Sequence, residues 1–237
     1  MRGIASLAAT FHIVALSAVL QPSSGLAEAK IGIASATKNQ VHGIVGGGSR
    51  IVSTGSELFS NETVRTGEAS LAQLLFLDQT SLSVGPRSEV RLDRFVYNPD
   101  RKSGSVVLEA SRGAFRFITG SQNPTHYTVK TLATIGVRGT IFSARIGRTG
   151  EHIYVLQGRV HVHTARGDYV LNAGDALSLS AGAAAQRVRW DSTQYDSPDG
   201  LSDPNLIPYP GSEDRDLRNQ LEAIDLRSRP LPSRRSD

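Results

Sequence analysis

Short runs of alternating apolar and polar residues fill the chain from about residue 41 to residue 180. Such alternation places successive side chains on opposite faces of an extended strand. Turn-forming residues separate the runs at short, regular intervals, which is typical of all-β proteins. The predicted strands cover residues 63–66, 71–76, 81–84, 89–96, 105–110, 113–118, 127–131, 134–145, 152–163, 169–171 and 176–179.

This pattern predicts an all-β domain of about ten or more strands over residues 41–180. We expect an antiparallel β-sandwich or a short solenoid-like stack. Helices alternating with strands are excluded here, because no convincing helix lies between the runs. No internal period survives counting, so a repeat array is not predicted.

The alternation also assigns faces. Val160 and Val162 point to one side of their strand, while Arg159, His161 and His163 point to the other, and Gly158 interrupts the phase. A second interruption is predicted at Gly139, where a strand containing Arg138 bulges or bends before the alternation resumes.

The first 29 residues have the layout of a secretory signal peptide: a positive charge, an apolar stretch over residues 4–20, a break, and small residues. Cleavage is predicted after Ala27 or after Ala29. A retained anchor is the alternative, but the apolar stretch is short for a membrane span. We therefore expect a periplasmic protein with no membrane anchor after cleavage.

Residues 30–40 are interpreted as a lead-in and residues 181–211 as a Pro-, Ser- and Asp-rich linker, with one more candidate edge strand at residues 187–190. Residues 212–226 are predicted to form a short helix, which favours docking on its own domain over docking on a partner. The apolar stripe of this helix consists of Leu217, Leu221 and Ile224. Residues 227–237 read as a disordered basic tail.

Composition narrows the function classes. The chain contains no cysteine, so an exported form must gain its stability from an ordinary core, which suits a bacterial periplasm. The formal charge of +4 is too small to indicate nucleic-acid binding.

Candidate enzyme signatures are weak. His161 and His163 share one strand face, and with His152 they form a candidate metal site of a cupin-like enzyme. Such sites usually add a carboxylate a few residues on, whereas the nearest carboxylate, Asp168, lies across a turn. The glycine-rich residues 43–48 lack a following Lys-Ser/Thr pair and read as a hairpin or flexible lead-in. We therefore predict no enzyme activity, no metal and no cofactor.

Five ordered motifs carry a resemblance to the FecR domain, the periplasmic module named for the ferric-citrate regulator. They are residues 62–67 (ETVRTG), 69–83 (ASLAQLLFLDQTSLS), 108–115 (LEASRGAF), 131–142 (TLATIGVRGTIF) and 154–162 (YVLQGRVHV). The resemblance covers about residues 40–180. The chain departs from the pattern at Gln79, where glycine is commoner, and at Leu132, where proline is usual.

The resemblance implies an all-β, non-catalytic module that acts in protein interaction, sensing or regulation at the cell envelope. Its expected partner is a periplasmic or envelope protein. An alternative is binding of envelope glycan (peptidoglycan) through aromatic side chains: Tyr97, Tyr127, Tyr169 and Trp190. The family positions matched here are Asp78, Gly113, Thr131, Gly136, Val137, Arg138, Gly139, Thr140, Phe142 and Gly158.

Arg138 raises a question of its own, because it interrupts an apolar strand. A guanidinium carries five donors in a fixed fork, which suits gathering carbonyls or a carboxylate inside a fold. We expect Arg138 to be an internal staple, with Asp78 as one candidate partner. Contact with a ligand is the alternative.

Overall fold

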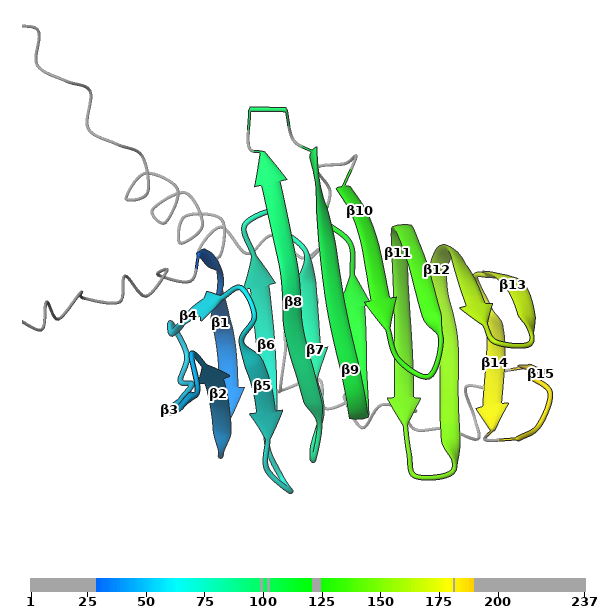
Figure 1. The fold of residues 1–237 in the computed structure, drawn as a ribbon, viewed down its shortest axis with the longest axis horizontal. Coiled ribbons are helices and arrows are strands. Elements are labelled where there is room, and N and C mark those ends of the chain that lie inside the picture. Colours follow the sequence, from blue (N-terminus) through cyan, green and yellow to red (C-terminus); the bar gives the residue numbers. More distant parts are fainter. Residues whose placement is uncertain (1–28, 99, 102, 121–124, 181, 190–237) are drawn as a thin grey trace, which may run out of the picture.

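The computed structural model describes residues 29–98, 100–101, 103–120, 125–180 and 182–189 (Figure 1). The predicted signal peptide, apart from Ala29, lies outside these residues, as do the predicted helix at 212–226 and the basic tail at 227–237. Within the described part of the chain, no helix is long and apolar enough to cross a membrane.

All the described strands belong to a single mixed sheet of 15 strands. They are β1 (Lys30–Lys38), β2 (Val41–Val45), β3 (Gly48–Ile51), β4 (Glu57–Phe59), β5 (Thr63–Thr66), β6 (Leu71–Phe76), β7 (Ser81–Val84), β8 (Glu89–Asn98), β9 (Ser103–Ile118), β10 (Thr125–Lys130), β11 (Thr134–Ile146), β12 (Gly150–Thr164), β13 (Gly167–Asn172), β14 (Asp175–Ser180) and β15 (Gln186–Arg189).

The predicted all-β class is confirmed, and three details differ. The sheet is not wholly antiparallel, because β10 pairs with β9 in parallel register. The predicted lead-in at residues 30–40 is mostly β1, which pairs with β4 and β6. The candidate edge strand at residues 187–190 appears as β15 beside β14. With β1 and β15 included, the sheet extends beyond residues 41 and 180, the predicted bounds of the domain. The glycine-rich residues 43–48 belong to the β2–β3 hairpin.

Three long strands bend in their middle and so pair with different neighbours along their two halves. The first part of β9 pairs with β8 and β10, whereas its last residues, 113–118, pair with β7 and β11. The bends coincide with residues of positive φ: Gly113 in β9, Gly139 in β11 and Gly158 in β12. The sheet therefore folds over itself into two layers.

We call these the first layer and the second layer. The first layer contains β2, β3, β5, β8, β10, β13, the start of β9, the start of β11 and the end of β12. The second layer contains β1, β4, β6, β7, β14, β15, the end of β9, the end of β11 and the start of β12. Figure 1 shows β1–β4 at one end of the assembly and β13–β15 at the other.

The core lies between the two layers and is mostly apolar. Rings from the two layers meet there: the centroids of Phe117 and Tyr127 lie 5.3 Å apart, and those of Phe76 and Phe95 lie 5.8 Å apart. Aromatic pairs at such distances add to the stabilisation that their buried area provides.

The bends in β11 and β12 pack against each other. A Cβ on Gly158 would lie 2.4 Å from the carbonyl oxygen of Gly139, and the register of β11 against β12 shifts between Arg138 and Ile141. The predicted interruptions at Gly139 and Gly158 are therefore confirmed as one paired irregularity, at which both strands pass between the layers.

A buried polar network ties the layers together at Asp78, in the turn between β6 and β7. The Tyr127 hydroxyl, from the first layer, donates to Asp78 Oδ2 over 2.6 Å. Thr80 donates to the same carboxyl through its backbone N–H and lies within hydrogen-bond distance of it and of Tyr127 through its hydroxyl. Burial raises the pKa of Asp78, although the hydrogen bonds from Tyr127 and Thr80 act to lower it.

Replacing Tyr127→Phe is expected to lower the free energy of unfolding by about 2 kcal/mol, because a buried carboxyl group loses its donor from the opposite layer. Urea unfolding measures the change. The control is Tyr169→Phe, since the half-buried Tyr169 makes no hydroxyl hydrogen bond within the described ranges. Equal losses in the two variants would show that the hydrogen bond to Asp78 contributes no measurable stability.

Candidate functional site

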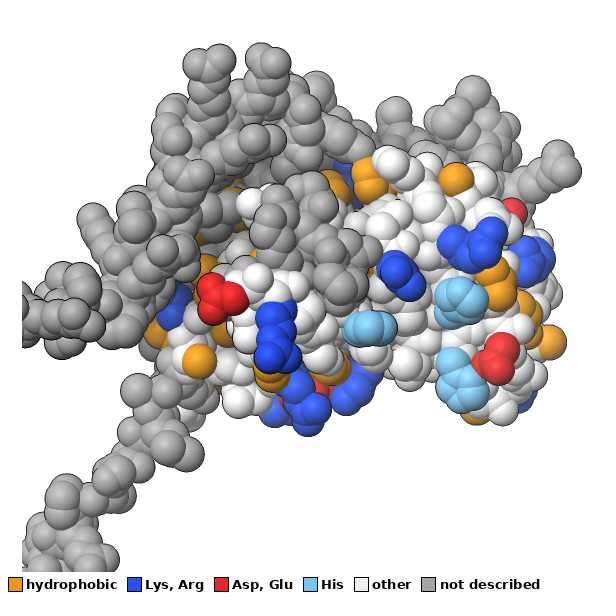
Figure 2. Space-filling model, turned by 90° about the horizontal axis from the view of Figure 1, so that it is seen from above, with side chains coloured by type: hydrophobic (Ala, Val, Ile, Leu, Met, Phe, Trp, Pro, Cys, Tyr) orange, Lys and Arg blue, Asp and Glu red, His pale blue; other side chains and the backbone are white. Residues whose placement is uncertain are grey.

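Basic side chains gather on the outward face of the first layer over β10, β11 and β12. Strand alternation puts them there: Ile135 and Val137 face the core, so Gly136 and Arg138 face outward. We call this surface the cationic face, and it consists of His126, Lys130, Arg138, Arg159, His161 and His163, all exposed. Figure 2 shows histidine and Lys/Arg side chains close together on this half of the molecule.

Two arginines of this face lie directly opposite each other. Arg138 of β11 is the register partner of Arg159 of β12. Arg159 Nε donates to Asn172 Oδ1 over 3.0 Å, so its partner on the far side is neutral. Like charges that face each other across strands are destabilising, and a bound anion would remove that cost.

The prediction that Arg138 is an internal staple is wrong. Its side chain is exposed, and its guanidinium makes no hydrogen bond or ion pair with any residue that the structure describes. Its candidate partner, Asp78, is instead bound by Tyr127 and Thr80. Strand alternation explains the result, because Ile135 and Val137 face the core and Arg138 therefore faces outward; the bulge at Gly139 changes the phase only afterwards and turns Thr140 inward. The alternative, contact with a ligand, fits this position.

Gly136 lies at the centre of the cationic face, between Thr128 and His161. Its φ is not positive, and a Cβ added there would meet no atom closer than 3.8 Å. Neither backbone strain nor crowding requires glycine at this position. Its effect is to leave the strand backbone uncovered beside Arg138, where a bound chain can approach closely.

The three candidate metal ligands are not brought together. His161 and His163 project from one face as predicted, and His163 contacts Asp168 on β13. His152 lies beyond the bend in β12, on the outer face of the second layer, where its ring stacks near Tyr154. No group of three or more metal-ligating side chains occurs in the described part of the chain. The bend at Gly158 is the reason, because it separates the two halves of β12.

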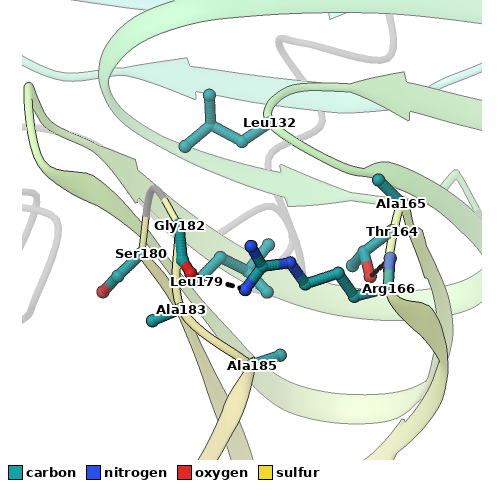
Figure 3. Close-up of a pocket in the computed structure, with 9 residues that line it drawn as sticks. All are labelled: Leu132, Thr164, Ala165, Arg166, Leu179, Ser180, Gly182, Ala183 and Ala185. Atoms are coloured by element: carbon teal, nitrogen blue, oxygen red, sulfur yellow. Dashed lines mark hydrogen bonds between the residues drawn. The ribbon is translucent and has the colours of Figure 1, made fainter.

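A small pocket opens between the turn that follows β12 and the segment that follows β14 (Figure 3). Its volume is about 210 Å³, and its lining is mostly aliphatic. Arg166 crosses it and donates from Nη1 to the Gly182 carbonyl oxygen over 2.7 Å. The lining residues are Leu132, Thr164, Ala165, Arg166, Leu179, Ser180, Gly182, Ala183 and Ala185. We call it the rim pocket.

A buried carboxyl group lies behind this pocket. Glu151 is fully buried, and its Oε2 accepts hydrogen bonds from the Thr131 hydroxyl (2.7 Å) and the Leu132 backbone N–H (3.2 Å). Its Oε1 has no hydrogen-bond partner within the described ranges. Burial raises the pKa of Glu151 to about 7, even though these two hydrogen bonds lower it. Glu151 therefore holds the turn that carries the exposed Leu132.

Sequence reasoning missed Glu151, although a signal was present. Glu151 has the same parity as Ile153 and Val155, the core-facing residues of β12. A carboxylate on the apolar side of a strand indicates a buried acid. Among the predicted glycan-stacking aromatics, Tyr127 is buried in the core and Trp190 lies outside the described residues.

A comparison with protein-family models matches the middle of the chain. Residues 62–161 match the family model described as FecR protein, which confirms the resemblance over these residues. The match begins at the first of the five motifs and ends within the last. No curated protein matches the chain.

The fold is similar to that in two crystal structures of a candidate anti-sigma factor from Parabacteroides distasonis. In each comparison the identity is 16%, the TM-score is 0.47, and the match covers 55% of this chain and 61% of that chain.

Proposed function

From the FecR domain at residues 62–161, we propose that this protein is a non-catalytic regulatory or sensing module of the cell envelope. We propose further that its cationic face binds an acidic segment of a protein partner. The facing pair Arg138–Arg159 carries the proposal, because these two exposed like charges are register partners and neither forms an ion pair with a carboxylate in the described part of the chain.

The charge pattern explains why an acidic partner fits. Strand neighbours repeat about every 4.8 Å, so His126, Arg138 and Arg159 form a row of basic groups across β10, β11 and β12. Carboxylates of an extended segment can bind an arginine through paired hydrogen bonds. Such complementarity accelerates association and selects against basic partners.

The rim pocket supplies a second contact. An aliphatic side chain of the bound segment fits a lining made of Leu132, Leu179 and alanines. Burying one such side chain contributes about 1.5–3 kcal/mol. The proposed ligand is thus an acidic stretch with one apolar anchor residue.

The proposed location is the periplasm of a bacterium. The support is the sequence of residues 1–29, with its positive charge, apolar stretch and small residues in signal-peptide order. The absence of cysteine is consistent with this location.

Replacing Arg138→Glu is expected to weaken binding to poly-L-glutamate, used as an acidic probe, by about tenfold or more at low salt. The control, Arg148→Glu, makes the same charge change at an exposed turn that the register places at the opposite end of β11. Fluorescence anisotropy of the labelled probe measures binding. The Arg138→Glu variant should also be slightly more stable than the native chain, because Arg159 then faces an opposite charge.

The same two variants decide the partner class in a pull-down from periplasmic extract. A protein retained by the native chain and by Arg148→Glu, and lost with Arg138→Glu, supports the proposal. Equal retention by all three chains contradicts it. Co-sedimentation of all three with purified sacculi, with no protein retained, would favour glycan binding instead.

A further inference from the structure

Much of the outer face of the second layer is buried, although the core lies on its other side. Register partners form a continuous outward row across six strands: Gln73, Ser83, Arg116, Ser143, Tyr154 and Ala176. The row beside it contains Leu75, Ser81, Ile118 and Ile141. Gln73 is 4% exposed and Ile141 and Tyr154 are 8% exposed, yet none of these residues belongs to the core cluster.

Burial at this level requires another layer of atoms over the face. The 15 described strands all belong to the folded sheet, so the described residues supply no further layer on this side. The cationic face shows what an uncovered outer face looks like, since its six side chains are all exposed. The second layer differs in carrying Leu71, Leu75, Ile141 and Tyr154 outward.

We propose that residues 212–226 of the same chain dock on this outer face as an amphipathic helix, with Leu217, Leu221 and Ile224 packed against it. This inference is independent of the cationic face and its partner. In this arrangement, the apolar stripe of the helix packs on the side of the sheet that no described strand covers.

Chain length permits this arrangement. β15 ends at Arg189, at the β14 edge of the second layer, and 22 residues separate it from residue 212. Such a linker spans up to about 70 Å when extended, whereas the six strands of the row extend over about 24 Å. A 15-residue helix is about 22 Å long and therefore covers most of that row.

Charge also fits. Residues 212–226 contain five acidic residues and two arginines, a net charge of −3. The outer face presents Arg116 within the row and Arg145 and His152 beside it. An acidic amphipathic helix is therefore attracted to this face and is a poor fit to a negatively charged surface.

The absence of cysteine allows a direct test by thiol labelling of the full chain. Ser83→Cys places one thiol in the covered row, and Ser105→Cys places one on the exposed side of β9 as a reference. We expect the Cys at position 83 to react at least about tenfold more slowly than that at position 105.

Adding Leu221→Asp to Ser83→Cys should raise its labelling rate by about tenfold or more, because one buried leucine of the stripe is lost. The matched control, Asn219→Asp, adds the same charge on the opposite side of the helix and should leave the rate unchanged. Circular dichroism checks that the sheet stays folded, and Ser81→Cys repeats the measurement one row away if Ser83→Cys is unstable.

Three results would overturn the proposal. The thiol at position 83 could stay protected in the Leu221→Asp background, which would exclude the stripe as the cover. Asn219→Asp could accelerate labelling equally, which would make the effect one of charge. Protection could also disappear on dilution, which would show that a second copy of the chain covers the face.

Discussion

Gly113→Ala is expected to destabilise the protein by about 4 kcal/mol, a large fraction of the stability of an ordinary domain. Gly113 has a φ of +94°, which costs an L residue about 1–2 kcal/mol. A Cβ there would also lie 2.0 Å from Ser88 Oγ and 2.5 Å from Ser88 Cα. Since one of those atoms is backbone, the bend itself must shift to accept the methyl group.

Two control glycines separate these causes. Gly47 has a φ of +81° with no atom within 4 Å of an added Cβ, so Gly47→Ala should cost only the backbone term, about 1 kcal/mol. Gly136 has neither a positive φ nor a close neighbour, so Gly136→Ala should change stability by less than about 0.5 kcal/mol. Urea unfolding of the three variants tests the series. A loss in Gly113→Ala no larger than that in Gly47→Ala would mean that the contact with Ser88 is not tight.

Glu151→Gln is expected to stabilise the protein above pH 7, by about 3 kcal/mol. The pKa of Glu151 is about 7 in the folded protein against a usual value of 4.5. Below pH 4.5 the carboxyl group is protonated in both the folded and the unfolded chain and contributes nothing. Between these values the unfolded chain has lost the proton that the folded chain keeps, so stability falls by about 1.4 kcal/mol per pH unit.

The measurement is the free energy of unfolding at several pH values from 4 to 8.5. The native chain should lose stability relative to Glu151→Gln as the pH rises to 7, and the difference should then be constant. Comparing slopes removes any constant cost of burying the amide. Glu109→Gln removes an exposed carboxylate, so its plot of unfolding free energy against pH should run parallel to that of the native chain. Parallel curves for Glu151→Gln would show that Glu151 is ionised in the folded protein at acid pH.

Periodicity predicted most of the fold because the two faces of each strand differ. Phe115 and Phe117 share the core side of β9, and Val160 and Val162 share that of β12, as their spacing indicates. The prediction could not reveal the parallel pairing of β9 and β10, since alternation shows which way a side chain points and says nothing of which strand lies beside it.

The candidate site was harder to predict, as Arg138 and Glu151 illustrate. An arginine between apolar residues suggested a buried role, but alternation already placed Arg138 opposite the core-facing Ile135 and Val137. The carboxylate that is buried, Glu151, drew no attention because it is surrounded by ordinary strand residues. Its partners, Thr131 and Leu132, lie about twenty residues away, and only the folded chain brings them together.

The bent strand β9 also sets the order in which this protein can fold. β9 pairs with four other strands: β7, β8, β10 and β11. Until β9 is in place, β8 has only β5 and β7 has only β6 as a neighbour. A chain that ends before residue 103 therefore cannot close its core, and closing long loops before this strand pairs makes folding slow. We therefore expect the pairing of β9 to be the step that joins the strands on both sides of it into one core.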